Sequence, residues 1–488
     1  MRRARPSLLI CLITIANCFG AEKVEILRDQ YGVPHIFART ATAAAFASGY
    51  AQASDRGEQL LSNLRNAQRG APSTISPHVR SIVEAYCAGV NSYFGENRVD
   101  ASMVEAFGRS AFGLIRESND ILIAPSRSSE KAPIAILAPY AEWSDASRLY
   151  AMDVETDEGF AFAGMGPVGV PFPLIGHSDA IAIGVRGEGP GGEKALDQAW
   201  AMVSSRTLEE AKRALAMGQL PSQTFLIATS AGEIYDSHEG LANPPEGILM
   251  GGAGVPQAVA MTRDLISRAS TFSLESATSL AFATDVYKAE TWQLRIARSA
   301  PGSEFVRMLT GWSRKAEANS RPALAFYLFK MALGGDASAI EPPQHLTEER
   351  LHAALRRAQD RFETEFPVDA TYGSLFRIMR EGERRSWPVG GGTAAEAGMA
   401  TPRAVAFEHR GPVMVGHGGQ AGVMVVLLTK PLKSVMALPF GESDSPESPH
   451  FEDQARELYS RSYTTATWFG DRKNLEKKFK DRKELVFP

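Results

Sequence analysis

The stretch VEILRDQYGVPHI, residues 24–36, sets the pattern from which the rest of the chain is interpreted. Its apolar residues at 24–27 indicate an extended segment, the residues at 31–34 indicate a turn, and a second extended piece follows through Ile36. Two segments with helical spacing come next, at 42–69 and 77–93. The N-terminal region is therefore predicted to be a short strand pair followed by helices.

The composition is that of a globular protein large enough for one or two cores, with 488 residues of which 44% are hydrophobic and 22% charged. A formal net charge of -4 gives no basic field for nucleic acid or anionic lipid. The three cysteines, Cys11, Cys18 and Cys87, exclude a disulfide-rich scaffold and have no Cys-x-x-Cys spacing. Nucleic-acid binding and metal–thiolate chemistry are therefore not expected.

The N-terminal residues 1–20 have the features of a secretory signal peptide. Arginines at positions 2, 3 and 5 precede an apolar run at 8–16 and then small residues. The run is too short to span a membrane as a helix. We expect a periplasmic or secreted protein without a membrane span, and lipidation of Cys18 stays open as an alternative.

Downstream of residue 120 the pattern changes to short apolar runs bounded by Gly, Pro and Ser, which predict strands. A helical block follows at about 257–333, and strands return before a basic C-terminal tail. No fixed-period repeat or low-complexity linker separates independent domains, so one intertwined α and β unit is expected, with its strands in two groups. The predicted strands lie at 121–124, 134–137, 160–163, 180–183, 225–228, 422–428 and 435–440.

Two short motifs suggest chemistry that their surroundings contradict. The GMGPVG stretch at 164–169 fits a dinucleotide loop, but the prolines that follow at 171 and 173 forbid the helix that would hold a pyrophosphate. The GHSDA stretch at 176–180 fits a nucleophile elbow around Ser178, but strand-like residues follow it where a helix is needed. The histidines show no metal spacing, so we expect neither metal nor cofactor.

An ordered set of segments resembles the penicillin acylase family of N-terminal nucleophile hydrolases. The end of the chain is similar to the branch that includes aculeacin and acyl-homoserine-lactone acylases. The segments are residues 24–36, GYAQASDR at 49–56, AYCAGVN at 85–91, SND at 118–120, and GESDSPESPHFEDQ at 441–454.

This resemblance implies an α+β fold, a four-layer αββα sandwich with a helical lobe. It also implies a precursor cut between Glu117 and Ser118, giving a mostly helical small chain, 21–117, and a large chain, 118–488, that stay associated. The reaction implied is hydrolysis of a small-molecule acyl amide through an acyl-ester on Ser118. The freed α-amine of the same residue would act as the base, because a serine hydroxyl alone is a weak nucleophile.

The resemblance also assigns supporting roles. The backbone N–H of Gly187 is the expected oxyanion donor, and Ala253 falls where the family carries its oxyanion Asn. Tyr140 falls in the segment where the family carries His or Gln. The substrate is expected to be a penicillin, a fatty-acyl amide or an N-acyl-homoserine lactone, with its acyl group in an apolar pocket. The residues expected to bind it are Tyr140, Phe160, Phe162 and Phe172.

Two hypotheses remain open because the chain departs from the family pattern. Glu117 stands where a Gly is usual before the nucleophile, and the stretch 251–254 contains no Asn. Loss of one oxyanion donor costs on the order of 10²- to 10³-fold in rate. The chain is thus either a secreted amidohydrolase or an uncut member that serves as a non-catalytic periplasmic binding or structural protein. The charged residues in the small chain, Arg28, Asp29, Asp55 and Arg56, are expected to hold the fold.

Overall fold

The computed structural model describes residues 21–67, 74–144, 146–251, 256–299, 302–334, 343–380, 382–383 and 385–488. The predicted signal peptide, with Cys18, lies outside these residues. No helix in the described ranges is both long and apolar enough to cross a membrane.

The largest sheet of the described structure has ten strands in the order β13-β12-β11-β10-β9-β8-β7-β2-β1-β22. Neighbours run antiparallel, except that β2 and β7 are parallel. The strands span β1 Glu22–Arg28, β2 Pro34–Ala38, β7 Leu149–Thr156, β8 Ala161–Pro167, β9 Ile175–His177, β10 Ile181–Gly187, β11 Gln223–Thr229, β12 Ile234–Asp236, β13 Leu241–Ala242 and β22 Arg482–Phe487.

Two smaller sheets face the large one. One has the order β14-β4-β5-β19-β20-β21, and the other has the order β16-β15-β18-β6-β3, with β17 paired to β18. Strand β10 contacts β3, β5 and β6, and β11 contacts β4. The strands span β3 Glu117–Ser118, β4 Ile121–Ile123, β5 Ile134–Leu137, β6 Pro139–Glu142, β14 Ile248–Met250, β15 Phe376–Ile378, β16 Trp387–Pro388, β17 Val405–Arg410, β18 Val413–Gln420, β19 Val423–Leu427, β20 Lys433–Ala437 and β21 Thr465–Ala466.

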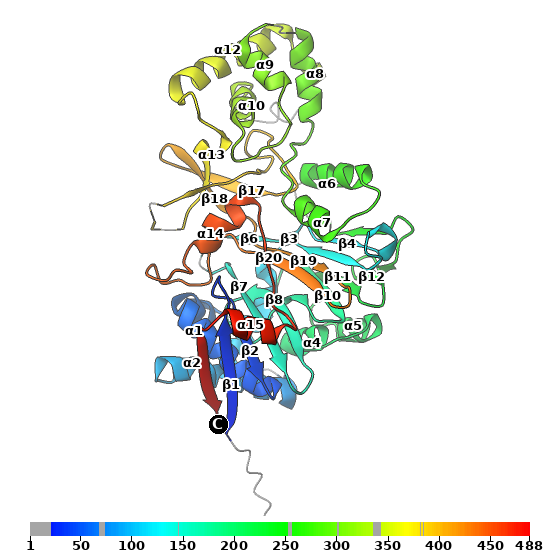
Figure 1. The fold of residues 1–488 in the computed structure, drawn as a ribbon, viewed down its shortest axis with the longest axis vertical. Coiled ribbons are helices and arrows are strands. Elements are labelled where there is room, and N and C mark those ends of the chain that lie inside the picture. The colour runs from blue at the N-terminus through cyan, green and yellow to red at the C-terminus, as the bar shows by residue number, and fades with distance from the viewer. Residues whose placement is uncertain are drawn as a thin grey trace, which may run out of the picture.

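Helices cover the outer faces of these sheets (Figure 1). Helix α1 contacts β1, β2 and β7 of the large sheet, and α5 contacts β11. On the other side, α7 contacts β5 and β19. The predicted α+β class, with helix, sheet, sheet and helix layers, is confirmed. The helices span α1 Ala41–Asn66, α2 Pro77–Phe94, α3 Ala101–Ala111, α4 Ala195–Val203, α5 Leu208–Leu215, α6 Pro256–Arg268 and α7 Leu274–Ala281.

The α1–α2 pair packs closely because of two glycines. A Cβ on Gly49 would lie 2.2 Å from the carbonyl oxygen of Tyr86, and one on Gly89 would lie 1.9 Å from that of Phe46. Both contacts are with backbone, which cannot yield as a flexible side chain can. These glycines belong to the quoted segments at 49–56 and 85–91, so that part of the pattern reflects helix packing.

A helical lobe stands at the end of the molecule away from α1 and α2 (Figure 1). Its helices are α8 Ala289–Ser299, α9 Glu304–Thr310, α10 Arg321–Ala332 and α12 Glu348–Glu365, with the short α13 Tyr372–Leu375 below them. The helical block predicted at 257–333 is confirmed as α6 through α10. Helix α12 was not predicted; its Leu351, Leu355 and Phe362 bury one face of the helix.

The strands fall in two groups along the chain, at 22–250 and 376–487, and these groups form three sheets. The C-terminal tail is no loose basic segment: after α14 Asp453–Glu457 and α15 Arg472–Lys478, β22 pairs with β1 over six residues, from Glu22↔Phe487 to Leu27↔Arg482. Leu485 faces inward, whereas the lysine and arginine side chains of β22 face solvent at the sheet edge.

Candidate active site

Ser118 lies where one strand passes from one small sheet to the other. As part of β3 it pairs with Pro139 of β6, and three residues later β4 begins in the neighbouring sheet. The backbone N–H of Asn119 donates to the carbonyl of Ala138 at 2.9 Å, so the chain stays paired across the break. Ser118 is thereby fixed between the large sheet and the two small ones.

The hydroxyl of Ser118 is buried beside Asp120, and it forms no hydrogen bond of regular geometry with the described residues. The residue is 3% exposed, whereas the preceding Glu117 side chain is exposed. A Cβ on Gly251 would lie 3.1 Å from Ser118 Oγ, so the absence of a side chain there leaves room beside the hydroxyl. Because buried hydroxyls normally find partners, this one is a candidate reactive group.

Asp120 is an acidic neighbour of Ser118 for which the sequence predicted no role. Its Oδ1 accepts from the N–H of Ala138 at 2.6 Å, while its Oδ2 is buried without a partner among the described residues. Burial raises the pKa of Asp120 to about 6, although the Ala138 N–H, the Ser118 hydroxyl and the charge of Arg186 lower it. The side chain therefore titrates near neutral pH beside the hydroxyl.

Close backbone contacts hold Asp120 in place. A Cβ on Gly184 of β10 would come within 2.5 Å of Asp120 Oδ2, and the N–H of Gly251 donates to the Asp120 carbonyl at 2.8 Å. The signal that could have found Asp120 is its position two residues after the serine, on the same side of an extended chain.

Gly187, the expected oxyanion donor, lies at the end of β10, and its N–H donates to the carbonyl of Ile115 at 2.9 Å. A Cβ there would lie 2.2 Å from the carbonyl oxygen of Ser222, so the position requires glycine. In the uncut chain, the carbonyl of Ile115 therefore accepts from the N–H that the resemblance assigns to the oxyanion. Ala253 lies outside the described residues.

Tyr140 fixes a neighbouring segment. Its hydroxyl donates to the carbonyl of Pro402 at 2.8 Å, and the side-chain amide of Asn119 donates to the same oxygen at 3.3 Å. Burial raises the pKa of Tyr140 well above its usual range, so its hydroxyl stays protonated. The structure therefore brings Tyr140 and Asn119 together through Pro402, beside the Ser118 strand.

The three phenylalanines predicted to bind an acyl group have other contacts. Phe160 and Phe172 pack against Trp200 of α4, with ring centroids 4.5 and 5.3 Å apart, and Phe162 is fully buried in β8. No ring contact of the described structure joins them to Tyr140.

The rejected motifs behave as the sequence analysis predicted. Ser178 Oγ accepts from the N–H groups of Ala180 and Ile181, and strand β10 follows it. Burial lowers the pKa of His177 to about 4. The 164–169 motif runs out of β8 into turns rather than into a helix. Neither motif forms an elbow or a dinucleotide loop.

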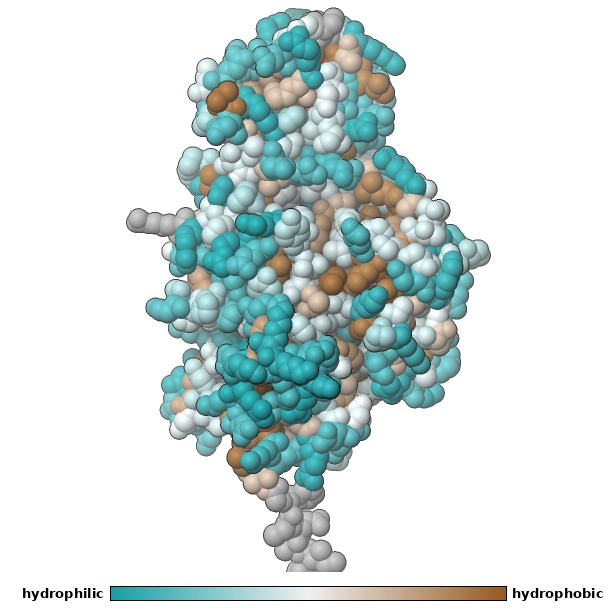
Figure 2. All heavy atoms as spheres, viewed as in Figure 1, coloured by the Kyte–Doolittle hydropathy of each residue, from teal (hydrophilic) through white to brown (hydrophobic). Residues whose placement is uncertain are grey.

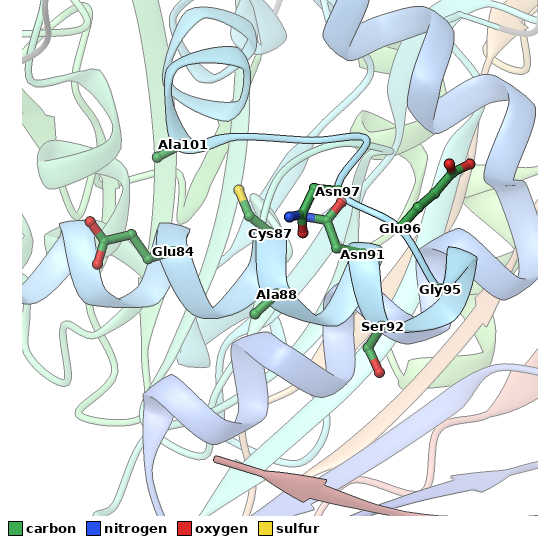
Figure 3. Close-up of a pocket in the computed structure, with 9 residues that line it drawn as sticks. All are labelled: Glu84, Cys87, Ala88, Asn91, Ser92, Gly95, Glu96, Asn97 and Ala101. Carbon is green, nitrogen blue, oxygen red and sulfur yellow. The ribbon is translucent and has the colours of Figure 1, made fainter.

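A further hollow of about 610 Å³ lies on α2, away from the Ser118 site, and contains the free Cys87 (Figure 3). Its sulfur lies on the face of α2 along which the chain continues toward Ala101. Burial, with the charges of Asp100 and Glu84, raises the pKa of the Cys87 thiol to about 12. A protonated thiol is a poor nucleophile, so Cys87 is no rival to Ser118.

No three His, Cys, Asp or Glu side chains of the described residues are grouped as metal ligands would be. The charged residues Arg28, Asp29, Asp55 and Arg56 hold the fold as predicted. Arg28 pairs with Asp55 at 2.7 Å, and Arg56 donates to the carbonyls of Gly441 and Glu442. Asp29 accepts from the N–H groups of its own turn.

Comparison with known proteins gives the family. The model of the penicillin amidase family matches residues 23–70, 98–186 and 256–475, a range that includes Ser118 and Tyr140 but neither Gly187 nor Ala253. No curated protein matches the chain. Among solved structures, the chain is similar to a thermostable penicillin G acylase from Alcaligenes faecalis in an orthorhombic form, at 13% identity and a TM-score of 0.49, over 75% of this chain and 98% of that one. Since the family model covers well over half of the sequence, the chain belongs to the penicillin amidase family, a family of amidohydrolases.

Proposed function

We propose that this protein hydrolyses small-molecule acyl amides with Ser118 as the nucleophile, after its own chain is cut before that residue. The observation that carries the proposal is the buried Ser118 hydroxyl, unbonded among the described residues, with Gly251, which has no side chain, beside it. Family membership supplies the reaction class.

The cut is an intramolecular acyl transfer. Ser118 Oγ attacks the carbonyl carbon of Glu117, the C–N bond of the peptide breaks, and the nitrogen takes up the hydroxyl proton to become an amine. Water then hydrolyses the resulting ester, leaving a carboxylate on Glu117 and a free hydroxyl on Ser118. The exposure of the Glu117 side chain supports access of water to that ester.

Turnover uses the same atoms. The freed α-amine accepts the hydroxyl proton as Oγ attacks the substrate's acyl carbon, and it passes that proton to the departing amine. Water then releases the acid from the ester. An α-amine has a pKa near ~8, and burial lowers it further, so it is a competent base at neutral pH.

The oxyanion site requires a change of partner. The Gly187 N–H is bonded to Ile115 in the continuous chain, and we propose that it turns to the substrate oxygen once the cut frees residues 112–117. Ala253 supplies no side-chain donor at the position of the family's Asn, and an acyl pocket that includes Tyr140, Phe160, Phe162 and Phe172 remains part of the proposal. Export to the periplasm or medium is also proposed.

The two chains would remain associated after the cut. Strand β2 of the small chain pairs with β7, and β1 pairs with β22. Buried Arg56 donates 2.6 and 2.8 Å bonds to the backbone of 441–442 and lies 3.6 Å from Asp444. These contacts do not include the Glu117–Ser118 bond, so breaking that bond leaves them intact.

The test is the intact mass and N-terminal sequence of the exported protein, with Ser118→Ala as the variant and Ser178→Ala as a control serine. We expect two chains from wild type and from Ser178→Ala, the larger beginning Ser-Asn-Asp-Ile, and one chain from Ser118→Ala. Acyl p-nitroanilides of increasing length then measure turnover. Equal turnover by Ser118→Ala contradicts the mechanism.

A second candidate function is that of an uncut, non-catalytic binding protein. The observation that favours it is the bond between the Gly187 N–H and Ile115, which fills the expected oxyanion donor. A single wild-type chain beginning near Ala21, without turnover of any anilide, would support this alternative over the hydrolase.

A further inference from the structure

A groove of about 970 Å³ lies between helices α6 and α7, strand β16 and the turn at 456–462. We call it the α6–α7 groove. Figure 2 shows hydrophobic residues gathered on this face near α6 and α7. The apolar side chains that line it are Leu265, Phe272, Leu280, Phe282, Trp387 and Pro388.

Behind this groove lies a buried positive charge. Arg403 is 0% exposed, and none of the described carboxylates forms an ion pair with it. Its guanidinium stacks 5.1 Å from the ring centroid of Phe282 and 4.3 Å from that of Tyr459. An arginine keeps its charge in proteins, and a buried charge without a counter-ion is costly.

Ser462 connects the Arg403 guanidinium to the groove. Arg403 Nη1 donates to Ser462 Oγ at 3.0 Å, and Ser462 lines the groove. Since Ser462 Oγ accepts that bond, its own proton is available for a ligand atom in the groove. Nη2 donates to the Tyr459 carbonyl at 2.7 Å, and Nε is buried without a partner among the described residues.

The rim of the groove carries both signs. Lys315 lies 3.9 Å from Asp285, and Arg456 pairs with Glu457 at 2.5 Å. Arg461 and Glu317 also line the groove, so the three rim cations are balanced by Asp285, Glu317 and Glu457. Together with Arg403 behind the wall, the balance favours a negative ligand group.

We propose that the α6–α7 groove is a binding site for an aliphatic carboxylate, with the chain on the apolar wall and the carboxylate at Ser462. The ligand supplies the counter-charge that Arg403 lacks. The wall of the groove is linked to the strand of Ser118. The backbone N–H of Arg403 donates to the carbonyl of Ala283, and the carbonyl of Pro402 accepts from the side chains of Asn119 and Tyr140. The proposal does not depend on catalysis by Ser118.

The test is calorimetric titration of the full protein with sodium decanoate below its micelle concentration, with 1-decanol as the neutral probe. The variant is Ser462→Ala, and the matched control is Ser460→Ala, which also lines the groove but whose hydroxyl donates to the Arg456 carbonyl at 3.5 Å. Ser462 is partly exposed, but its hydroxyl is the acceptor for buried Arg403 Nη1, so urea unfolding first checks that Ser462→Ala stays folded.

We expect saturable binding of decanoate to wild type and Ser460→Ala, at least tenfold weaker binding to Ser462→Ala, and at least tenfold weaker binding of decanol to wild type. Absence of saturable decanoate binding overturns the proposal. So does equal affinity for decanol, or equal affinity of the two serine variants. None of these outcomes depends on whether Ser118 cuts the chain.

Discussion

Gly251→Ala tests whether the space beside Ser118 is used in the reaction. The added methyl would lie 3.1 Å from Ser118 Oγ and 3.4 Å from Asp120 Cβ. Gly251 has no positive φ, so its backbone accepts alanine. The methyl must therefore displace the hydroxyl by a few tenths of an ångström, or occupy the place of the acyl group.

The magnitude follows from this geometry. Misplacement of reacting atoms by about 1 Å costs on the order of 10²-fold in rate. A tenfold loss corresponds to about 1.4 kcal/mol in the activation free energy. We expect Gly251→Ala to slow cutting and turnover by ~30- to 100-fold, or roughly 2–3 kcal/mol, while the free energy of unfolding changes by less than about 1 kcal/mol.

The assay compares Gly251→Ala with Gly311→Ala, whose methyl would meet the Arg307 carbonyl at 3.2 Å in the helical lobe. Chain cutting is followed by mass spectrometry over time, turnover by release of nitroaniline, and stability by urea unfolding. Gly311→Ala should keep wild-type rates. The reasoning is refuted if Gly251→Ala cuts and turns over as fast as Gly311→Ala.

Three further predictions concern buried groups. Burial raises the pKa of Asp120 from 3.8 to about 6, so its protonated form is favoured in the folded state. Wild type should lose ~3 kcal/mol of unfolding free energy as pH rises through that window, and Asp120→Asn should not, as urea titrations at several pH values will show. Burial lowers the pKa of Lys330 from 10.5 to about 7, so wild type should gain stability as pH rises between these values. Lys330→Met should be more stable than wild type at pH 7 by roughly a few kcal/mol, and its unfolding free energy should not rise between pH 7 and 10.5. If the unfolding free energies of the two proteins rise in parallel with pH, Lys330 is not the titrating group. Tyr140→Phe should lose ~1 kcal/mol with its bond to Pro402, measured by thermal melting, and an unchanged melting temperature would show that Asn119 alone holds that carbonyl.

Local features of the fold could be predicted from the sequence. The strand pair before Ile36 appears as β1 and β2, and the two helical segments appear as α1 and α2. These elements follow from hydrophobic period, from caps such as Thr40, and from glycines that permit close helix packing. Such signals act over a few residues or one face of an element.

Part of the candidate site was predicted as well. Ser118 was identified by its place among ordered segments, and the structure shows it buried at the start of a strand pair. Asp120 was missed because its unusual pKa arises from burial against Gly184 and Ala138, which lie far from it along the chain. The hydrogen bond from the Gly187 N–H to the Ile115 carbonyl could not be predicted either, since it joins the end of β10 to a segment distant in the chain.

The sequence by itself determined many of the helices and strands, showed that two motifs are unsuited to a dinucleotide loop or an elbow, and indicated Ser118 as the candidate nucleophile. The tertiary structure alone decided that the C-terminal segment becomes the edge strand β22, that Asp120 faces Ser118, and that Arg403 lies uncompensated behind the α6–α7 groove. The physical reason is that hydrophobic periodicity acts locally, whereas strand partners, desolvation and the balance of buried charge depend on contacts between residues distant in the chain.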